Sequence, residues 1–177
     1  VSPPPRSPPP APAYVRAELT VRSTVEPHEA PVSQLAGLVS KIVAIEGPVH
    51  IDEVSRRISA AFGKARTGQR IAEATARAVR HALDMDKDLR QSGSFLLTAQ
   101  QESKPPVRDR SGETGNLIKA ACLPPMEIAA AAAMIRAESG EMAQQELVVA
   151  TARLLGFQRV GAELAQALEA ALSNGGG

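Results

Sequence analysis

The sequence predicts a mainly α-helical protein made of two tandem units, each a helix-turn-helix or winged-helix-like set of three helices, with short β-strands. The first observation is a repeat at a constant separation of 93 residues: Gly63, Arg66 and Gly68 of the first copy return as Gly156, Arg159 and Gly161. The second is that apolar residues recur every three or four positions in several segments, which is typical of helices. The third is one alternating segment and one hairpin-like segment, both short. A separation that holds without a gap indicates one structural unit used twice.

The composition is typical of a small globular chain with a thin helical core. The chain has 177 residues, of which 44% are apolar and only 2% aromatic, so alanine fills much of the interior. Its net charge of +1 excludes a general attraction to polyanions, and any basic patch has to be local.

Several classes of site and location are not expected. The single cysteine, Cys122, excludes an internal disulfide and a cysteine-based zinc site. The histidines His28, His50 and His81 are scattered without a second ligand at metal spacing, so we expect no metal and no cofactor. Every apolar run is too short to span a membrane and no signal-peptide pattern is present, so we expect a cytoplasmic protein. The start at Val1 in a proline tract indicates a fragment of a larger protein.

The first residues are predicted to form a linker and then a strand. Residues 1–13 are mostly proline, which fixes φ and lacks an amide proton, so they indicate a semi-rigid linker. A docking peptide for a proline-recognising domain is the alternative. Residues 14–25 carry apolar side chains at every second position from Val15 to Val21, which predicts a half-buried strand.

Three helices and a hairpin follow. We expect helices at 33–46, 51–62 and 67–83, and a hairpin at 89–97. Ser33 and Thr67 are the predicted N-caps of the first and third helices, and Gly63 suits a left-handed residue at the end of the second. Three helices followed by a hairpin is the order of a winged helix-turn-helix, so residues 14–97 form the first predicted unit.

The second copy is expected to repeat the helices without the hairpin. Residues 98–116 are polar and rich in turn residues, which predicts an interdomain linker. Within the second unit, at 117–173, we expect a short strand at 117–123 and helices at 126–137, 144–155 and 161–172, followed by a tail at 174–177.

The third helix of the first copy is the candidate nucleic-acid surface. At 100° per residue, one face carries Arg66, Arg70, Glu73, Arg77, Arg80 and His81, and the opposite face carries Ile71, Ala78 and Ala82. Lys64 at its start and Lys87 and Arg90 near the hairpin extend the positive surface. An arginine-rich third helix suits a DNA groove, whereas a solvated or protein-docking face, with Glu73 and Arg77 as a plain i,i+4 pair, is the alternative.

The second copy keeps the apolar face and loses the basic one. The residues that match Arg70, Glu73, Arg77, Arg80 and His81 are Glu163, Gln166, Ala170, Ser173 and Asn174. An acidic or neutral face opposes phosphate, so this copy is expected to serve as a scaffold or partner surface.

Arginine returns even where the basic face is lost, as Arg66 and Arg159, and so does glutamate, as Glu53 and Glu146. We expect a Glu53–Arg66 and a Glu146–Arg159 ion pair to tie the second helix to the start of the third in each copy. Direct phosphate contact by Arg66 is the alternative.

Two sets of segments carry a resemblance to a known family. In the first copy they are Glu46 to Glu53, Arg56 to Ile58 and the box from Gly63 to Ile71, and in the second copy Leu123 to Ile128 and Leu154 to Gly161. With them, residues 14–172 resemble the domain of unknown function at the C-terminal end of large bacterial proteins related to superfamily 1 DNA helicases. Those proteins often carry a nuclease domain of the very-short-patch-repair type. The resemblance implies helicase-like and nuclease-like domains upstream as partners within one protein.

No enzymatic chemistry is expected within this chain. It has no Gly-x-x-x-x-Gly-Lys-Ser/Thr phosphate loop, and the segment from Gly112 to Gly115 is a turn. We therefore expect an accessory, non-catalytic module that binds nucleic acid, DNA above all, through its first copy. The alternative is a protein-interaction or scaffolding module without nucleic-acid contact.

Overall fold

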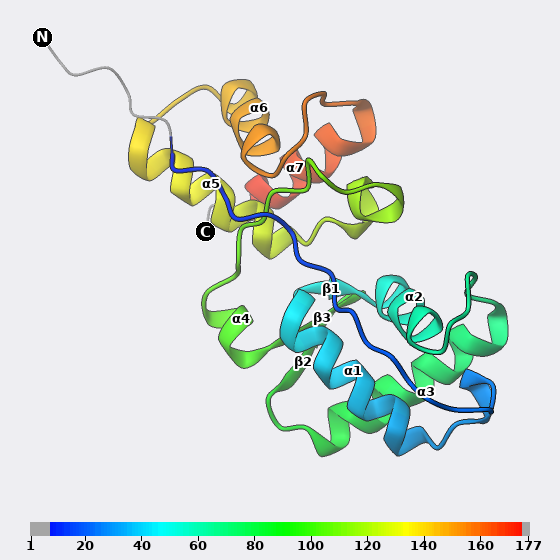
Figure 1. Cartoon of the computed structure of the whole chain (residues 1–177). Helices are drawn as coiled ribbons and strands as arrows, with labels where there is room; N and C mark the ends of the chain where they lie inside the picture. Colours follow the sequence, from blue (N-terminus) through cyan, green and yellow to red (C-terminus); the bar gives the residue numbers. More distant parts are fainter. Residues whose placement is uncertain (1–7, 175–177) are drawn as a thin grey trace, which may run out of the picture. The chain divides into compact units, whose positions relative to one another are not determined.

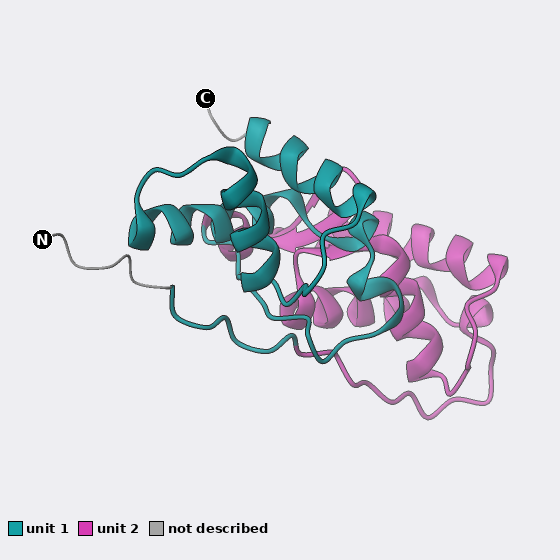
Figure 2. Ribbon diagram, turned by 90° about the horizontal axis from the view of Figure 1, so that it is seen from above, with its two compact units in different colours: residues 1–14, 104–177 teal, residues 15–103 magenta. Residues whose placement is uncertain are grey.

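The computed structural model describes residues 8–174, and they form two compact units. Among the described residues, the N-terminal unit consists of 15–103, and the C-terminal unit consists of 104–174 together with 8–14 (Figure 2, magenta and teal). The chain is mainly helical with one small sheet, which confirms the predicted fold class (Figure 1). Within the described residues, no helix has the length and apolar character needed to cross a bilayer.

The N-terminal unit holds three long helices, a short helix at each end and three strands. In chain order they are η1 Pro27–Glu29, α1 Val32–Glu46, β1 Val49–His50, α2 Ile51–Ala61, α3 Gln69–Met85, β2 Leu89–Ser92, β3 Phe95–Thr98 and α4 Ala99–Ser103. Their core contains Val39 and Ile42 of α1, Ile58 of α2 and Ala78 of α3, all fully buried. The small alanine side chains on α3 allow the helices to pack closely with few aromatic residues.

The sheet has the strand order β1-β3-β2, with antiparallel pairs. The predicted hairpin is confirmed, and Leu89 of β2 pairs with Thr98 of β3. The sequence did not reveal β1, in which Val49 pairs with Leu96 and His50 with Phe95. Two residues are too few to show a period-two pattern, so only the partner strand makes them a strand.

The predicted strand at 14–25 is wrong, although the alternation is real. Ala17 is buried and Leu19 and Val21 pack against the core of the N-terminal unit, whereas Val15 is exposed. The backbone is extended but pairs with helices rather than with a strand. The Ala17 amide donates to Glu46 Oε2 at 2.9 Å, and the Val21 amide donates to the Ala61 carbonyl at 2.8 Å.

The C-terminal unit repeats the helices of the first copy. Its elements are η2 Gly115–Ile118, η3 Ala120–Cys122, α5 Pro125–Ser139, α6 Gln144–Leu154 and α7 Ala162–Asn174. The predicted strand at 117–123 is wrong, because η2 and η3 occupy it. Leu117 and Leu123 are buried and Ile118 is exposed, which suits a tight helical turn.

The repeat is confirmed element by element. The limits of η1, α1 and α2 and the start of α3 return 93 residues later as those of η3, α5, α6 and α7. The helix ends match as well: the Gly63 amide donates to the Ala60 carbonyl and the Gly156 amide to the Arg153 carbonyl, both at 3.0 Å. Gly63 has φ 74° and Gly156 has φ 96°, so both take the predicted left-handed conformation.

Both predicted side-chain caps are wrong. Pro31 is the N-cap of α1 and Gly68 is the N-cap of α3, and neither helix receives a hydrogen bond from a capping side chain. Thr67 instead shares a hydrogen bond with the Ser59 hydroxyl at 2.9 Å. This bond connects α2 to the turn before α3, so Thr67 stabilises the turn rather than the helix start.

The segments predicted as linkers are partly structured. In the range 98–116, α4 forms a helix, and Arg108 and Arg110 are buried in the C-terminal unit. In the range 8–13, the Pro12 carbonyl accepts from the Asp109 amide at 2.8 Å, so this stretch belongs to the C-terminal unit. Residues 1–7 of the predicted linker and 175–177 of the predicted tail lie outside the described residues.

Gly63 and Gly156 allow a matched test of the repeat. A Cβ at Gly63 meets no atom within 4 Å, whereas a Cβ at Gly156 meets the Arg110 and Ser111 amide nitrogens at 2.5 Å. We expect Gly63→Ala to lower the free energy of unfolding of its unit by about 1 kcal/mol, the cost of positive φ. Gly156→Ala should cost about 1 kcal/mol more because of overpacking. Urea unfolding with amide exchange resolved by unit measures both, and equal losses would contradict the close approach at Gly156.

Candidate nucleic-acid interface

The arginines of α3 lie opposite its buried face. Ile71 and Ala78 point into the core, while Arg70, Arg77 and Arg80 are exposed. Because residues three, four and seven apart share one side of a helix, the three arginines follow a single exposed face. Their predicted exposure is therefore confirmed.

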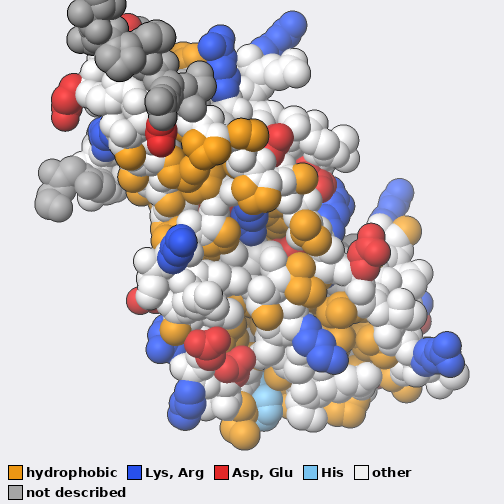
Figure 3. Space-filling model, turned by 60° about the vertical axis from the view of Figure 1, so that its left-hand side comes forward, with side chains coloured by type: hydrophobic (Ala, Val, Ile, Leu, Met, Phe, Trp, Pro, Cys, Tyr) orange, Lys and Arg blue, Asp and Glu red, His pale blue; other side chains and the backbone are white. Residues whose placement is uncertain are grey.

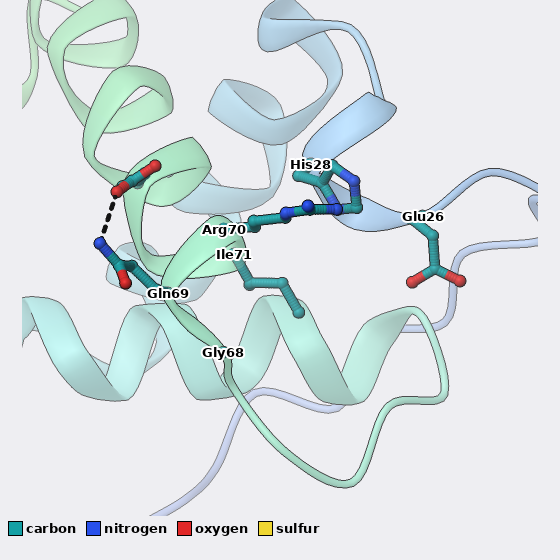
Figure 4. A pocket seen from close by; sticks show the side chains of 7 residues that line it. Glu26, His28, Gly68, Gln69, Arg70 and Ile71 are labelled. Carbon is teal, nitrogen blue, oxygen red and sulfur yellow. Dashed lines mark hydrogen bonds between the residues drawn. The ribbon is translucent and has the colours of Figure 1, made fainter.

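Four arginines of this region have no ion-pair partner in the part of the chain that the structure describes: Arg66, Arg70, Arg77 and Arg80. Glu73 accepts a hydrogen bond from the Gln69 amide group at 3.0 Å (Figure 4). The alternative i,i+4 pair between Glu73 and Arg77 is not formed. The arginine charges are thus available for an external anion.

Lys64 differs from these arginines. Its Nζ lies 2.7 Å from Glu26 Oε1, and both side chains are more than two-fifths exposed. Exposed pairs of this kind contribute at most about 1 kcal/mol, so a phosphate can compete for Lys64. The neighbouring Arg66 stands in the same turn, between Gly63 and the start of α3 at Gln69, and is exposed.

The hairpin end of the surface is mixed in charge. Lys87 and Arg90 are exposed, and Arg90 donates to the carbonyls of Lys87 and Leu89. Asp84 and Asp88 are exposed beside them. Figure 3 shows the same mixture on the face that it draws, where Lys and Arg side chains stand singly among acidic and apolar groups.

Asp84 belongs to the arginine face of α3, although the sequence pattern did not predict it there. The helix was expected to end at Leu83, but it continues to Met85, which places Asp84 four residues after Arg80 on the same side. His81 is only partly exposed. The face therefore carries Glu73 and Asp84 among its arginines.

An open hollow of about 530 Å³ lies at the start of α3. It is lined by Glu26, His28, Gly68, Gln69, Arg70, Ile71 and Glu73. In Figure 4 the Arg70 side chain extends toward His28, which comes from η1. The hollow thus brings η1 and the first turn of α3 to one place, with the Arg70 guanidinium at its edge.

The two predicted Glu–Arg pairs are wrong. Glu53 is buried and pairs with Arg56 and Arg57 of its own helix, while Arg66 is exposed. Glu146 and Arg159 are both exposed, and no described residue pairs with either. The repeated glutamate and arginine share sequence positions but not a contact, so Arg66 and Arg159 are not explained as internal partners.

A different ion cluster stabilises the N-terminal unit. Glu46, at the end of α1, is fully buried and accepts from Arg57 Nε at 2.7 Å and from Arg57 Nη2 at 2.8 Å. Arg57 also lies 3.1 Å from Glu53, and Glu46 binds the Ala17 amide. The cluster connects α1, α2 and the extended segment before η1.

A second cluster occupies the C-terminal unit at unrelated repeat positions. Glu127 in the first turn of α5 is fully buried and pairs with Arg108 and Arg110. Both guanidinium groups lie over the Tyr14 ring, at 4.7 and 5.2 Å from its centroid. The Arg110 Nε atom is buried without a hydrogen-bond partner. Among the described residues, no group of three His, Cys, Asp or Glu side chains gathers as a metal site would.

The third helix of the second copy has lost the cations, as the sequence indicated. Glu163, Gln166, Ala170 and Ser173 are exposed on α7, while Leu168 is fully buried. The same helix therefore occurs twice in this chain, once with an arginine face and once without. This makes α7 a natural control for experiments on α3.

Part of the chain matches a known protein family. A model of a protein family of unknown function, DUF3320, matches residues 25–73. The match runs from η1 to the first turn of α3, so it includes Arg66 and Arg70 and ends before Arg77. No curated protein and no solved structure matches the chain. The expected resemblance to a domain of unknown function is thus confirmed in this coarse form, over fewer residues than expected.

Proposed function

We propose that the N-terminal unit binds nucleic acid, DNA in the first place, as an accessory and non-catalytic module. The observation that carries this proposal is the set of four exposed arginines at the turn and on α3 that have no ion-pair partner among the described residues. Arginines in this state attract phosphates and release the counterions that DNA carries. The competing arrangement, an i,i+4 ion pair on the same helix, is not formed between Glu73 and Arg77, because Glu73 accepts from Gln69 instead.

The order of the elements supports the same function. The unit runs α1, β1, α2, α3 and then a hairpin that pairs with β1, which is the order of a winged helix-turn-helix. In such modules the third helix enters the major groove and the hairpin lies beside the backbone. Arg70, Arg77 and Arg80 on α3 are then the groove-side contacts, with Lys87 and Arg90 on the hairpin side and His81 at the edge of the helix face.

The start of α3 adds to the attraction. Its N-cap, Gly68, provides no side-chain acceptor for the first backbone amides of the helix. These amides and the helix dipole favour an anion, so a phosphate near Gln69 and Arg70 is well placed. Lys64 and Arg66 stand in the turn just before this point, which extends the proposed backbone contact.

The module is proposed to serve a larger protein. Over residues 25–73 the chain matches a family of unknown function. The proposed context is a protein related to superfamily 1 helicases, whose motor and nuclease domains act on the DNA that this unit holds. The C-terminal unit, whose α7 lacks cations, is proposed to pack against a neighbouring domain.

Salt-dependent binding of the 177-residue chain to a fluorescent DNA duplex tests the proposal. We expect each of Arg70→Ala, Arg77→Ala and Arg80→Ala to weaken binding similarly on different sequences. Each should lower the slope of log K against log salt by about 0.9, because one phosphate contact is lost. Glu163→Ala on α7 is the matched control and should leave binding unchanged or slightly stronger.

A protein-docking surface is the second candidate, because Glu73 and Asp84 share the arginine face. Asp84→Asn distinguishes the two. A DNA-binding face gains affinity for the duplex when this negative charge is removed, whereas a protein-docking face shows no salt-dependent DNA binding in either form. Absence of binding to duplex and single strands at low salt would contradict the nucleic-acid proposal.

A further inference from the structure

The hollow at the start of the third helix occurs in both copies. Five of the seven residues that line it beside α3 have counterparts 93 positions later that line a hollow of about 440 Å³ beside α7. The chain therefore forms the same depression twice, from two different sets of side chains. A depression that follows the repeat is a property of the unit and not an accident of one packing arrangement.

The two hollows differ at the rim. Beside α3, the lining residue Glu26 forms an ion pair with Lys64 at 2.7 Å. The residues at the matching positions beside α7 are Phe157 and Lys119, which cannot form such a pair. Phe157 is only partly buried. The hollow beside α7 therefore has an aromatic ring at the position where the unit of α3 has the Lys64–Glu26 ion pair.

The hollow beside α7 also continues into a neighbouring one. A depression of about 430 Å³ shares three of its lining residues: Ile118, Phe157 and Arg159. We call the two together the α7 furrow. Ile118 is 45% exposed at its edge, at the repeat position of Val25, which is 41% exposed. An exposed β-branched residue beside a partly buried ring is an apolar surface that a partner side chain can cover.

The charges in the hollow beside α7 favour an acidic partner. Lys119 and Arg159 are exposed, and neither has an ion-pair partner among the described residues. The carboxylates of the furrow are Glu163, at the start of α7 where the helix dipole is positive, and Glu113, which lines the neighbouring hollow. In the hollow beside α7, the two cations Lys119 and Arg159 outnumber the single carboxylate, Glu163.

We propose that the α7 furrow docks a short peptide segment of a partner protein that carries a large apolar side chain next to carboxylates. The apolar side chain covers Ile118 and Phe157, and the carboxylates meet Lys119 and Arg159. Nucleic acid is the less suitable occupant, because Glu163 faces the same site and α7 has no arginine along its length. The proposal is independent of DNA binding by α3, since it uses other residues in the other unit.

Titration of the isotope-labelled chain with two peptides tests it. The probe is Asp-Asp-Leu-Phe-Glu-Glu, and its charge-reversed form is Lys-Lys-Leu-Phe-Lys-Lys. We expect the acidic peptide to shift the amide signals of residues 118–120 and 157–164, and the basic peptide to bind at least about tenfold more weakly. Equal binding of the two peptides, no shift up to about 1 mM, or shifts confined to other residues would overturn the proposal.

Charge variants give the matched comparison. The double variant K119E/R159E should weaken the acidic peptide at least about tenfold. The control R136E/R153E makes the same charge change at two exposed residues outside the furrow and should leave binding within about twofold. Phe157→Ser should also weaken binding, and equal effects of the two double variants would refute the site. DNA affinity should be the same in both double variants, so a failure of either proposal is seen separately.

Discussion

Glu127→Ala is expected to lower the free energy of unfolding of the C-terminal unit by about 3–5 kcal/mol. The carboxylate is fully buried and is the shared partner of Arg108 and Arg110, which are themselves buried. Its removal leaves two guanidinium groups in the core without this compensating charge. The Tyr14 ring beneath them contributes a cation–π attraction that is smaller than the lost ion pairs. The Arg110 Nε atom, already without a hydrogen-bond partner, shows that the site has little spare capacity to satisfy them.

Hydrogen exchange under native conditions measures this loss unit by unit. The amides of α5, α6 and α7 should lose protection in Glu127→Ala, while those of α1, α2 and α3 keep theirs. Glu169→Ala, which removes an exposed carboxylate from α7, is the control and should change stability by less than about 0.5 kcal/mol. A loss in Glu127→Ala as small as in the control would contradict the view that the buried cluster stabilises the unit.

Glu46→Ala is expected to lower the free energy of unfolding of the N-terminal unit by about 3 kcal/mol, at the lower end of the range for a broken buried pair. Glu46 accepts both donors of the Arg57 fork and the Ala17 amide, so three hydrogen bonds are lost at once. The loss should be smaller than for Glu127→Ala, because Glu53, at 3.1 Å, remains as an ion-pair partner of Arg57. The extended segment before η1 should also detach from α1.

Amide exchange and proteolysis together check this prediction. Residues 15–24 should become cleavable in Glu46→Ala, and the amides of α1 and α2 should lose protection. Glu18→Ala, which removes an exposed carboxylate from the same extended segment, is the control. A larger loss of unfolding free energy in Glu46→Ala than in Glu127→Ala would show that Glu53 does not compensate the charge of Arg57.

The two buried ion clusters could not be predicted from the sequence. Glu46 follows Ile42 by four positions and so continues the apolar stripe of α1, and Glu127 precedes the buried Ala131 by four positions on the buried stripe of α5. A carboxylate on an apolar stripe is the signal that could have indicated a buried ion. The arginine partners of these carboxylates are separated from them by 11 to 19 residues, and no local pattern connects them.

The predicted Glu–Arg pairs failed for a related reason. The repeat shows that Glu53 is equivalent to Glu146 and that Arg66 is equivalent to Arg159. It does not show that the glutamate and the arginine of one copy are in contact. Arg56 and Arg57 are three and four residues from Glu53 on the same helix, which puts them within reach. Arg66 lies beyond the end of α2, in a turn that faces water. The nearer partners on the helix therefore bind the carboxylate.

The sequence placed the arginines of α3 on one face correctly, but it did not place Asp84 there. Helical periodicity alone places Arg70, Arg77 and Arg80 together, because side chains three, four and seven positions apart share a face wherever the helix exists. The end of that helix depends on non-local packing, since Ala82 is buried and draws the last turn into the core. That added turn brings Asp84 onto the face, which the expected end at Leu83 had left out.

The sequence by itself determined the duplication, the three helices of each copy, the left-handed glycines and the hairpin. Each of these features depends on interactions within a few residues, or on a sequence pattern that occurs in both copies. Only the tertiary structure decided what the extended backbone binds and which charges are buried together. It also formed β1, η2 and η3, which are too short to carry a period of their own. The physical reason is that an unpaired amide or a buried ion takes whichever partner the fold brings near, and that partner can lie anywhere in the chain.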